Sequence, residues 1–219
     1  MNQRMICARA FCRYLMLKKT EMKQDELRQK LIDGTIHVIA KDGLDRASTK
    51  QIGLATATNE AYIYRLFESK EDLLAKTFTA LDEELVSKAL LHLPVMYMHD
   101  IEFETRCRFY FVAVWDFLLG NREKCLAFIR YYYSPYFARC SSEEHTQRFL
   151  PLVKKFSDAF LDESNVWMIL NHILTTMLDF AVKVYDGAVP NDEDTSEHVF
   201  RLIYASVQQY FKNKERKVS

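Results

Sequence analysis

Hydrophobic residues recur along most of this chain at the three- and four-residue spacing that is typical of amphipathic helices. The first such stripe lies between Asp25 and Lys41, and Asp42-Gly43 supplies a stop signal directly after it. No segment alternates between apolar and polar residues as a half-buried strand would. The pattern therefore predicts an all-α fold, with further helices over Lys70 to Leu91, Ile101 to Leu119, Arg122 to Tyr133, Ser141 to about Leu161 (kinked or restarted at Pro151), Asn165 to Tyr185, and from a cap at Asp194 to about Lys212.

The stretch from Ser48 to Leu74 differs, because it holds two short helices, a tight turn and the start of a third helix. Ser48 and Gln51 have the spacing of a capping box, which predicts a helix beginning at Thr49. Asn59 is a good N-cap for a second short helix, Glu60 to Phe67, and Ser69 with Asp72 starts the next one. The residues expected to form their shared apolar core are Ile52, Ile63, Phe67, Leu73 and Leu74. A helix, a short turn and a second helix is the layout that places the second helix in the major groove of DNA.

Composition agrees with a helical protein that has an ample core. Only five Gly and four Pro occur among 219 residues, while 49% of the residues are hydrophobic and 27% are charged. No run approaches the ~20 apolar residues that a membrane span needs. The five cysteines lack C-x-x-C spacing, so the simplest interpretation is a reduced, cytoplasmic protein without a disulfide framework.

Charge is distributed unevenly over a chain that is neutral as a whole. Residues 1–24 hold six basic residues and one acidic residue, and three interpretations fit them: a flexible basic arm, an extra helix, or residues upstream of a true start at Met22. Residues 25–75 hold seven Lys and Arg against nine Asp and Glu, a net charge of −2. Phosphate binding favours local positive charge, so any nucleic-acid contact by this segment must depend on where its individual cations lie.

Residues 25–75 resemble the DNA-binding domain of the TetR/AcrR family of transcriptional regulators. The residues that match at the family's spacing are Gly43, Thr49, Ile52, Ile63-Tyr64, Phe67, Ser69-Lys70 and Leu73. The chain departs from the family around the turn, where Ala-Gly is replaced by Thr56-Ala57, the next apolar residue by Thr58, and an earlier Ala by Gly53. Losing the turn glycine is unfavourable if that position requires a positive φ. The resemblance implies a basic N-terminal extension at 1–24, a three-helix head with the helix-turn-helix at 25–75, and a larger helical lobe for effector binding and dimerisation at 76–219.

In the family, the exposed face of the second short helix contacts bases while both flanks contact phosphates. Carried onto this sequence, the base-facing candidates are Lys50, Glu60, Ala61, Tyr62 and Arg65, and the phosphate candidates are Thr49, Tyr64 and Lys70. The side-chain chemistry suits these roles, because Lys50 or Arg65 can pair with guanine acceptors and Glu60 can accept from cytosine. For Glu60, a simple exposed acid on a helix explains the residue equally well.

Aromatic residues crowd the segment from Phe109 to Phe137, and most of them must pack in a core. The three consecutive tyrosines, Tyr131 to Tyr133, cannot all face one way on a helix. Members of the family bind apolar or aromatic effectors between the helices of this lobe. The candidate lining residues here, each of which core packing also explains, are Trp115, Tyr132, His172, Thr176 and Phe180. The family's last two helices pair with their counterparts, which predicts a homodimer; burial of the same faces within one subunit is the alternative.

The resemblance implies a regulator that binds a double-stranded DNA operator, commonly a repressor released by a small apolar or aromatic effector, with no cofactor, no metal and no membrane. Two other classes of protein were weighed. An enzyme finds little support, because the chain has no nucleophile elbow, no glycine-rich phosphate loop and no H-E-x-x-H motif. Its acid clusters, at Asp82 to Glu84 and at Glu143-Glu144, read as solvated helix surface. An all-α adaptor of the same fold that has lost specific DNA binding agrees with the altered turn and the negative head.

Overall fold

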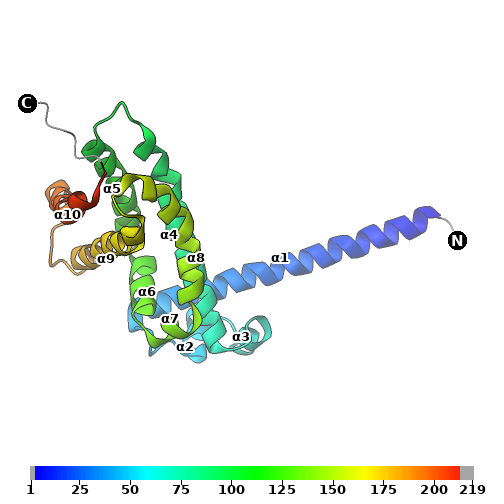
Figure 1. Ribbon diagram of the computed structural model, residues 1–219. Helices are drawn as coiled ribbons and strands as arrows, with labels where there is room; N and C mark the ends of the chain where they lie inside the picture. Colours follow the sequence, from blue (N-terminus) through cyan, green and yellow to red (C-terminus); the bar gives the residue numbers. More distant parts are fainter. Residues whose placement is uncertain (1–2, 213–219) are drawn as a thin grey trace, which may run out of the picture. The chain divides into compact units, whose positions relative to one another are not determined.

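The structure is a computed structural model that describes residues 3–212, with side chains from residue 21 onward except that of residue 163. Over this range the regular elements are helices, and the one extended pairing is an isolated bridge between Phe160 and Phe211 (Figure 1). The predicted all-α fold is confirmed. The helices are α1 Gln3–Asp42, α2 Thr49–Ala55, α3 Ala61–Leu66, α4 Lys70–His92, η1 Leu93–Tyr97, α5 Phe103–Gly120, α6 Arg122–Tyr132, α7 Pro135–Cys140, α8 Ser142–Phe156, η2 Ser157–Ala159, η3 Glu163–Asn165, α9 Val166–Tyr185, α10 Glu193–Val207 and η4 Gln208–Tyr210.

The chain divides into two compact units, Met1–Thr77 and Phe78–Ser219. Helix α4 belongs to both, because it begins at Lys70 and continues to His92. None of the described helices combines the length and the apolar character that crossing a bilayer would require.

The core of the N-terminal unit forms where α1 packs against α2 and α3. The stripe predicted for α1 is buried there, with Leu31 and Thr35 fully inaccessible and Val38 and Ile39 nearly so. The Thr35 hydroxyl donates to the Leu31 carbonyl at 2.7 Å, so this polar group is satisfied inside the helix. Helix α1 also extends well before the predicted start at Asp25, which agrees with the extra-helix interpretation for the backbone from Gln3 onward. Side chains 1–20 lie outside the described part of the chain.

The C-terminal unit is built around α9, which packs against α5, α6, α8 and α10. The tyrosine run separates as expected from its helical spacing. Tyr131 is 1% exposed and its hydroxyl lies 3.0 Å from the Ser141 hydroxyl, whereas Tyr133 is 69% exposed. The Tyr132 hydroxyl donates to Asn171 at 2.9 Å. Each tyrosine therefore has a different environment, and the buried one keeps a polar partner.

The helices of the C-terminal unit differ from the prediction at three places. Pro135 opens the short helix α7 instead of only ending α6, because Ser134 adopts an extended conformation and accepts from the Phe137 N–H at 3.4 Å. Helix α8 continues through Pro151 and ends at Phe156. Helix α10 is capped by Asp192, not Asp194, because Asp192 has the extended backbone of an N-cap and accepts from the Thr195 N–H at 2.8 Å.

Candidate DNA-binding surface and ligand cavity

Local hydrogen bonds form at the start of each helix in the helix-turn-helix segment. The Ser48 hydroxyl accepts from the Gln51 N–H at 3.2 Å, as predicted, and α2 begins at Thr49. The Asn59 side chain accepts from the Ala61 N–H at 2.9 Å, and α3 begins one residue later than expected. The Ser69 hydroxyl accepts from the Asp72 N–H at 3.0 Å. Side-chain caps thus fix the starts of α2 and α4, whereas the N-cap of α3 is Glu60, which makes no side-chain cap hydrogen bond.

The predicted shared core is confirmed and sets the orientation of α3. Ile52, Ile63, Leu73 and Leu74 are fully buried, and Phe67 is 5% exposed. Since Ile63 and Phe67 lie four residues apart, they anchor one side of α3 and the segment that follows it. The remaining side of α3 faces away from this core.

The turn between α2 and α3 has a Schellman hydrogen-bond pattern. The Thr58 N–H donates to the Gly53 carbonyl at 2.8 Å, and the Ala57 N–H donates to the Leu54 carbonyl at 3.2 Å. This motif places its penultimate residue in the left-handed region, and Ala57 has φ 48°. The position does require a positive φ, and alanine occupies it where the family has glycine.

Gly53, another departure from the family, is explained by the same turn. A Cβ added at Gly53 would lie 2.8 Å from the Thr58 carbonyl oxygen, which is backbone and cannot rotate away. The returning chain comes too close to α2 here for an alanine. The turn therefore uses glycine to allow this close approach and accepts strain at Ala57.

We expect Ala57→Gly to stabilise the protein by about 0.5–1 kcal/mol, because glycine adopts the left-handed conformation without the penalty of a β-carbon. Urea-induced unfolding, followed by circular dichroism, measures the change. The matched control is Ala55→Gly, at an exposed helical position two residues earlier. It should destabilise the protein by about 1 kcal/mol. A loss of stability in both variants would contradict the strain assigned to Ala57.

The eight predicted DNA-contacting residues all lie on α2, α3 or the ends of the helices beside them. Lys50, Glu60, Ala61 and Arg65 are exposed, Tyr62 is 41% exposed and Tyr64 is 60% exposed. Thr49 and Lys70 are half-buried. Two pairs form inside this set: the Thr49 hydroxyl donates to Glu60 at 3.1 Å, and the Arg65 guanidinium lies 5.9 Å from the centre of the Tyr62 ring.

The cations of this surface are not neutralised within the described part of the chain. Among the described residues, Lys50, Arg65 and Lys70 form no salt bridge. Glu60 instead accepts a hydrogen bond from the Thr49 hydroxyl. The surface thus offers three cations without a carboxylate partner and two exposed tyrosines, despite the negative charge of the segment.

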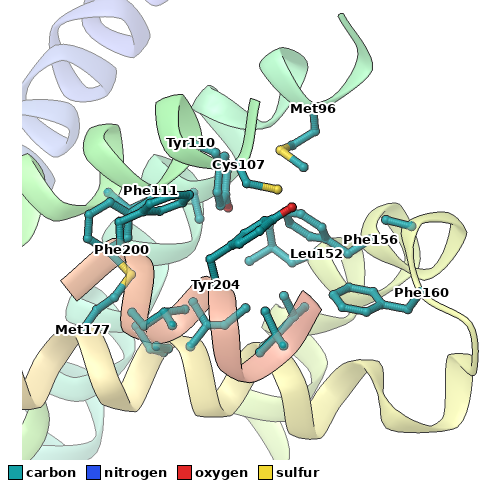
Figure 2. A pocket seen from close by; sticks show the side chains of 18 of the residues that line it. Met96, Cys107, Tyr110, Phe111, Leu152, Phe156, Phe160, Met177, Phe200 and Tyr204 are labelled. Atoms are coloured by element: carbon teal, nitrogen blue, oxygen red, sulfur yellow. The ribbon is translucent and has the colours of Figure 1, made fainter. Parts of the chain in front are cut away.

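A largely apolar cavity lies within the C-terminal unit. The cavity has a volume of about 120 Å³. Helices α4, α5, α8, α9 and α10 supply most of its wall, and Figure 2 shows labelled side chains from α5, α8, α9 and α10 converging on it. Among the described residues, those that line it are aliphatic, aromatic, methionine or cysteine side chains, and none carries a formal charge at neutral pH.

The five residues predicted from the sequence do not line this cavity. Trp115 is 2% exposed and packs on Phe111, Tyr132 is bonded to Asn171, and His172 is exposed beside Ser206. Thr176 and Phe180 are half-buried elsewhere on α9. The error is one of helix rotation, since successive residues point about 100° apart. On α9 the predicted residues lie on a face other than the one that lines the cavity, and on α5 Trp115 was predicted in place of its neighbour Val114. The residues of these two helices that line the wall include Ile173, Leu174, Met177 and Val114.

Two polar groups of the wall are held in their neutral forms by burial. Burial raises the pKa of the Cys107 thiol from 9.0 to about 12, an effect that Arg106 partly opposes and Glu104 adds to. Burial also raises the pKa of the Tyr110 phenol above its ordinary value. Both residues lie on α5, three positions apart and therefore on one face. They present neutral donors to the cavity at physiological pH.

A buried ionic cluster joins α4 to α8. Asp82 is inaccessible to solvent, and its two carboxylate oxygens lie 2.9 Å from His145 Nδ1 and 2.9 Å from an Arg148 nitrogen. Arg148 also donates to Glu144 at 2.8 Å. The sequence interpretation of Asp82 as solvated charge is wrong. Its position four residues after Phe78 and three before Leu85 was the available signal, because that spacing places it on the buried face of α4.

Comparison with known proteins agrees with this arrangement. Residues 31–77 match the family model of bacterial regulatory proteins, tetR family. A TetR family transcription regulator from Marinobacter aquaeolei VT8 has a TM-score of 0.67 at 15% identity, with 85% of this chain and 97% of that chain covered. The fatty acid degradation regulator FadR from Bacillus halodurans has a TM-score of 0.60 at 17% identity, covering 80% and 96%. The multidrug binding protein EbrR complexed with imidazole has a TM-score of 0.60 at 14% identity, covering 80% and 93%.

A search of curated protein sequences found no significant match. At these identities the solved structures show the shared fold, while the family model identifies the helix-turn-helix segment. Residues 31–77 therefore match the helix-turn-helix domain of bacterial regulatory proteins of the tetR family, and the chain has the all-α fold of solved tetR family regulators.

Proposed function

We propose that this protein is a ligand-responsive repressor that binds operator DNA through α2 and α3 and is released when a small apolar molecule occupies the cavity of the C-terminal unit. One observation carries the proposal: a helix-turn-helix whose cations form no salt bridge among the described residues occurs in the same chain as an apolar cavity. The cavity is comparable in size with an engineered apolar cavity of about 150 Å³ that binds benzene.

Contacts with DNA follow from the placement of the exposed side chains. Tyr62 and Arg65 on α3, with Lys50 on α2, are positioned to contact base edges. Tyr64, Thr49 and Lys70 donate to phosphates on the two flanks. Glu60 holds the Thr49 hydroxyl in the free protein, so that hydroxyl must exchange its partner when a phosphate arrives.

The coupling between ligand and DNA runs through α8 and α4. Phe149 and Leu152 of α8 belong to the cavity wall, and His145 and Arg148 of the same helix hold Asp82 of α4. Helix α4 continues to Lys70, a candidate phosphate contact. A ligand that displaces α8 therefore moves α4 with it. Linkage requires that DNA weaken ligand binding by the same factor by which the ligand weakens DNA binding.

Two copies of the chain pair through the outer sides of α9 and α10, so that two recognition helices meet successive major grooves. Met168 is 60% exposed and Leu202 is 57% exposed, and they supply apolar surface for this contact. Much of the apolar surface that the sequence assigned to the interface is instead buried within one subunit, including Leu174, Leu178 and Ile203. The proposed interface is thus narrower than the hydrophobic pattern alone indicates.

A gel-shift titration against the DNA upstream of the protein's own gene tests the proposal, with Tyr64→Ala and Lys70→Ala as the informative variants. The wild-type chain should shift a specific fragment. Lys70→Ala should weaken binding to all sequences and lower the slope of log K against log salt by about 1, because one phosphate contact is lost. Tyr64→Ala should weaken binding in the same sequence-independent way.

Lys76→Ala is the matched control, because Lys76 is an exposed lysine of the same helix that lies outside the proposed contacts. It should leave both affinity and salt slope unchanged. Absence of binding to every genomic fragment would contradict the regulator and favour an all-α adaptor. Equal losses from Lys70→Ala and Lys76→Ala would contradict the assigned contacts while leaving DNA binding itself intact.

A further inference from the structure

The functional groups of the cavity wall restrict the class of ligand more narrowly than the apolar character of the wall does. Twenty-two of the described residues line the cavity, and the heteroatoms of their side chains are two phenol hydroxyls, one thiol and two thioethers. Figure 2 shows the Cys107 thiol and the Tyr204 hydroxyl directed toward the same part of the cavity. The wall thus offers neutral hydrogen-bonding groups and no charge.

The cations next to the cavity are directed to other partners. Arg106 precedes Cys107 on α5, but its guanidinium donates to the Met96 carbonyl at 2.6 Å and lies 5.2 Å from the centre of the Phe103 ring. Arg108 forms a salt bridge with Glu197 and covers the Phe200 ring at 4.3 Å. Neither arginine belongs to the lining. An anionic ligand would therefore be desolvated without an opposite charge to meet it.

Two of the wall's hydrogen-bonding groups, those of Cys107 and Tyr110, come from one face of α5, where they lie three positions apart. The Tyr110 ring is fixed by an edge-on contact with Phe156, with 5.4 Å between ring centres, and both residues belong to the wall. Burial keeps the phenol and the thiol protonated, so each can donate one hydrogen bond but cannot attract a cation by ionising. The described residues of the wall also include no carboxylate, so a cationic ligand would have only aromatic faces to offset the loss of its hydration.

We propose that this cavity selects an uncharged, mainly apolar ligand that carries a single hydrogen-bonding group, which Tyr110 and Cys107 recognise. The inference rests on the proposed function in that it names the class of effector. It ranks carboxylates and quaternary ammonium compounds below uncharged compounds as ligands of this site, because the described residues of the wall hold no opposite charge for either.

Isothermal titration calorimetry of the full chain, without DNA, tests the proposal with three probes that share an octyl chain: octanol, octanoate and octyltrimethylammonium. Octanol should bind roughly 100-fold or more tightly than either ion, because a charge buried without a partner is costly. Tyr110→Phe should weaken octanol binding roughly three- to tenfold, as expected for one neutral hydrogen bond. Tyr136→Phe, which removes a phenol outside the cavity wall, should leave octanol binding unchanged.

Each contrary outcome overturns the proposal in a distinct way. Octanoate binding as tightly as octanol would indicate an acidic ligand and would assign Arg106, whose Nε atom is buried without a partner, as its counter-charge. Failure of all three probes would show that the cavity does not take ligands of this class. An unchanged octanol affinity in Tyr110→Phe would remove the assigned hydrogen bond. These results do not depend on DNA, so the gel-shift titration separates failure of the ligand class from failure of the regulator.

Discussion

Replacing Asp82 with alanine is expected to lower the free energy of unfolding by about 3–5 kcal/mol. The carboxylate is fully buried and receives hydrogen bonds from His145 and Arg148, each at 2.9 Å. His145 is itself 2% exposed, and its ring centre lies 4.6 Å from that of Phe149. Removing Asp82 leaves His145 without its carboxylate partner in a ring-lined interior, while Arg148 keeps only Glu144 and Thr79 as acceptors at hydrogen-bond distance. Urea-induced unfolding followed by circular dichroism measures the loss.

Glu83→Ala is the matched control, because Glu83 is the next acid along α4 and its side chain is 64% exposed. Its oxygen lies 3.9 Å from the Arg148 Nε atom, so this pair is solvent-screened and its removal should cost less than about 1 kcal/mol. Similar losses of unfolding free energy in the two variants would show that the burial of Asp82 does not increase its contribution to stability. A large loss confined to Asp82→Ala would support the rigid link from α8 to α4 on which the proposed coupling depends.

Features determined by nearby residues were predictable from the sequence. The caps at Ser48 and Ser69 and the apolar core around Ile63 follow from spacing within one or two helical turns, and the structure has them as expected. The predicted cap at Asn59 is wrong by one residue, because Glu60 is the N-cap of α3. Asp192 and Asp194 are both plausible N-caps two residues apart, and only the backbone conformation of Asp192 decides between them.

Features that depend on how helices rotate against one another were not predictable. The residues expected to line a cavity and those that do so are neighbours in sequence, such as Trp115 and Val114, yet adjacent helical positions face about 100° apart. The pairing of Asp82 with His145 joins residues 63 positions apart, and no local pattern specifies that contact. The spacing of residues in the sequence identifies the helices and their apolar faces. The packing between helices determines which residues line the cavity.

The altered turn of the helix-turn-helix combines a local hydrogen bond within α2 with a contact between α2 and α1. Thr56 replaces the family's alanine immediately before the strained Ala57, and it is 4% exposed. Its hydroxyl donates to the Ile52 carbonyl at 2.8 Å, which closes the end of α2. Its methyl group points at Gly34 of α1, where an added Cβ would lie only 2.1 Å from Thr56 Cγ2. Gly34 in the middle of α1, unfavourable for a helix on its own, is therefore the partner of a larger side chain in the turn.

Gly34→Ala is accordingly expected to destabilise the N-terminal unit by about 1–3 kcal/mol, although alanine favours a helix over glycine by about 1 kcal/mol at an ordinary position. The clash is with a branched side chain that α2 holds in place by a hydrogen bond, so it cannot be relieved by a simple rotation. Thr56→Ser removes the offending methyl group and keeps the hydroxyl. With that methyl group absent, the nearest remaining atoms lie 3.5 Å and 4.0 Å from the new Cβ, which is ordinary contact.

The double variant Gly34→Ala/Thr56→Ser should therefore regain the stability lost by Gly34→Ala and match or exceed the wild-type chain. A double-mutant cycle, measured by urea-induced unfolding, gives the coupling directly, and we expect about 1–3 kcal/mol between the two sites. Gly120→Ala is a control in the C-terminal unit, because nothing lies within 4 Å of a Cβ added there. Additive effects of Gly34→Ala and Thr56→Ser would mean that the two residues do not constrain each other, and that the altered turn has some other cause.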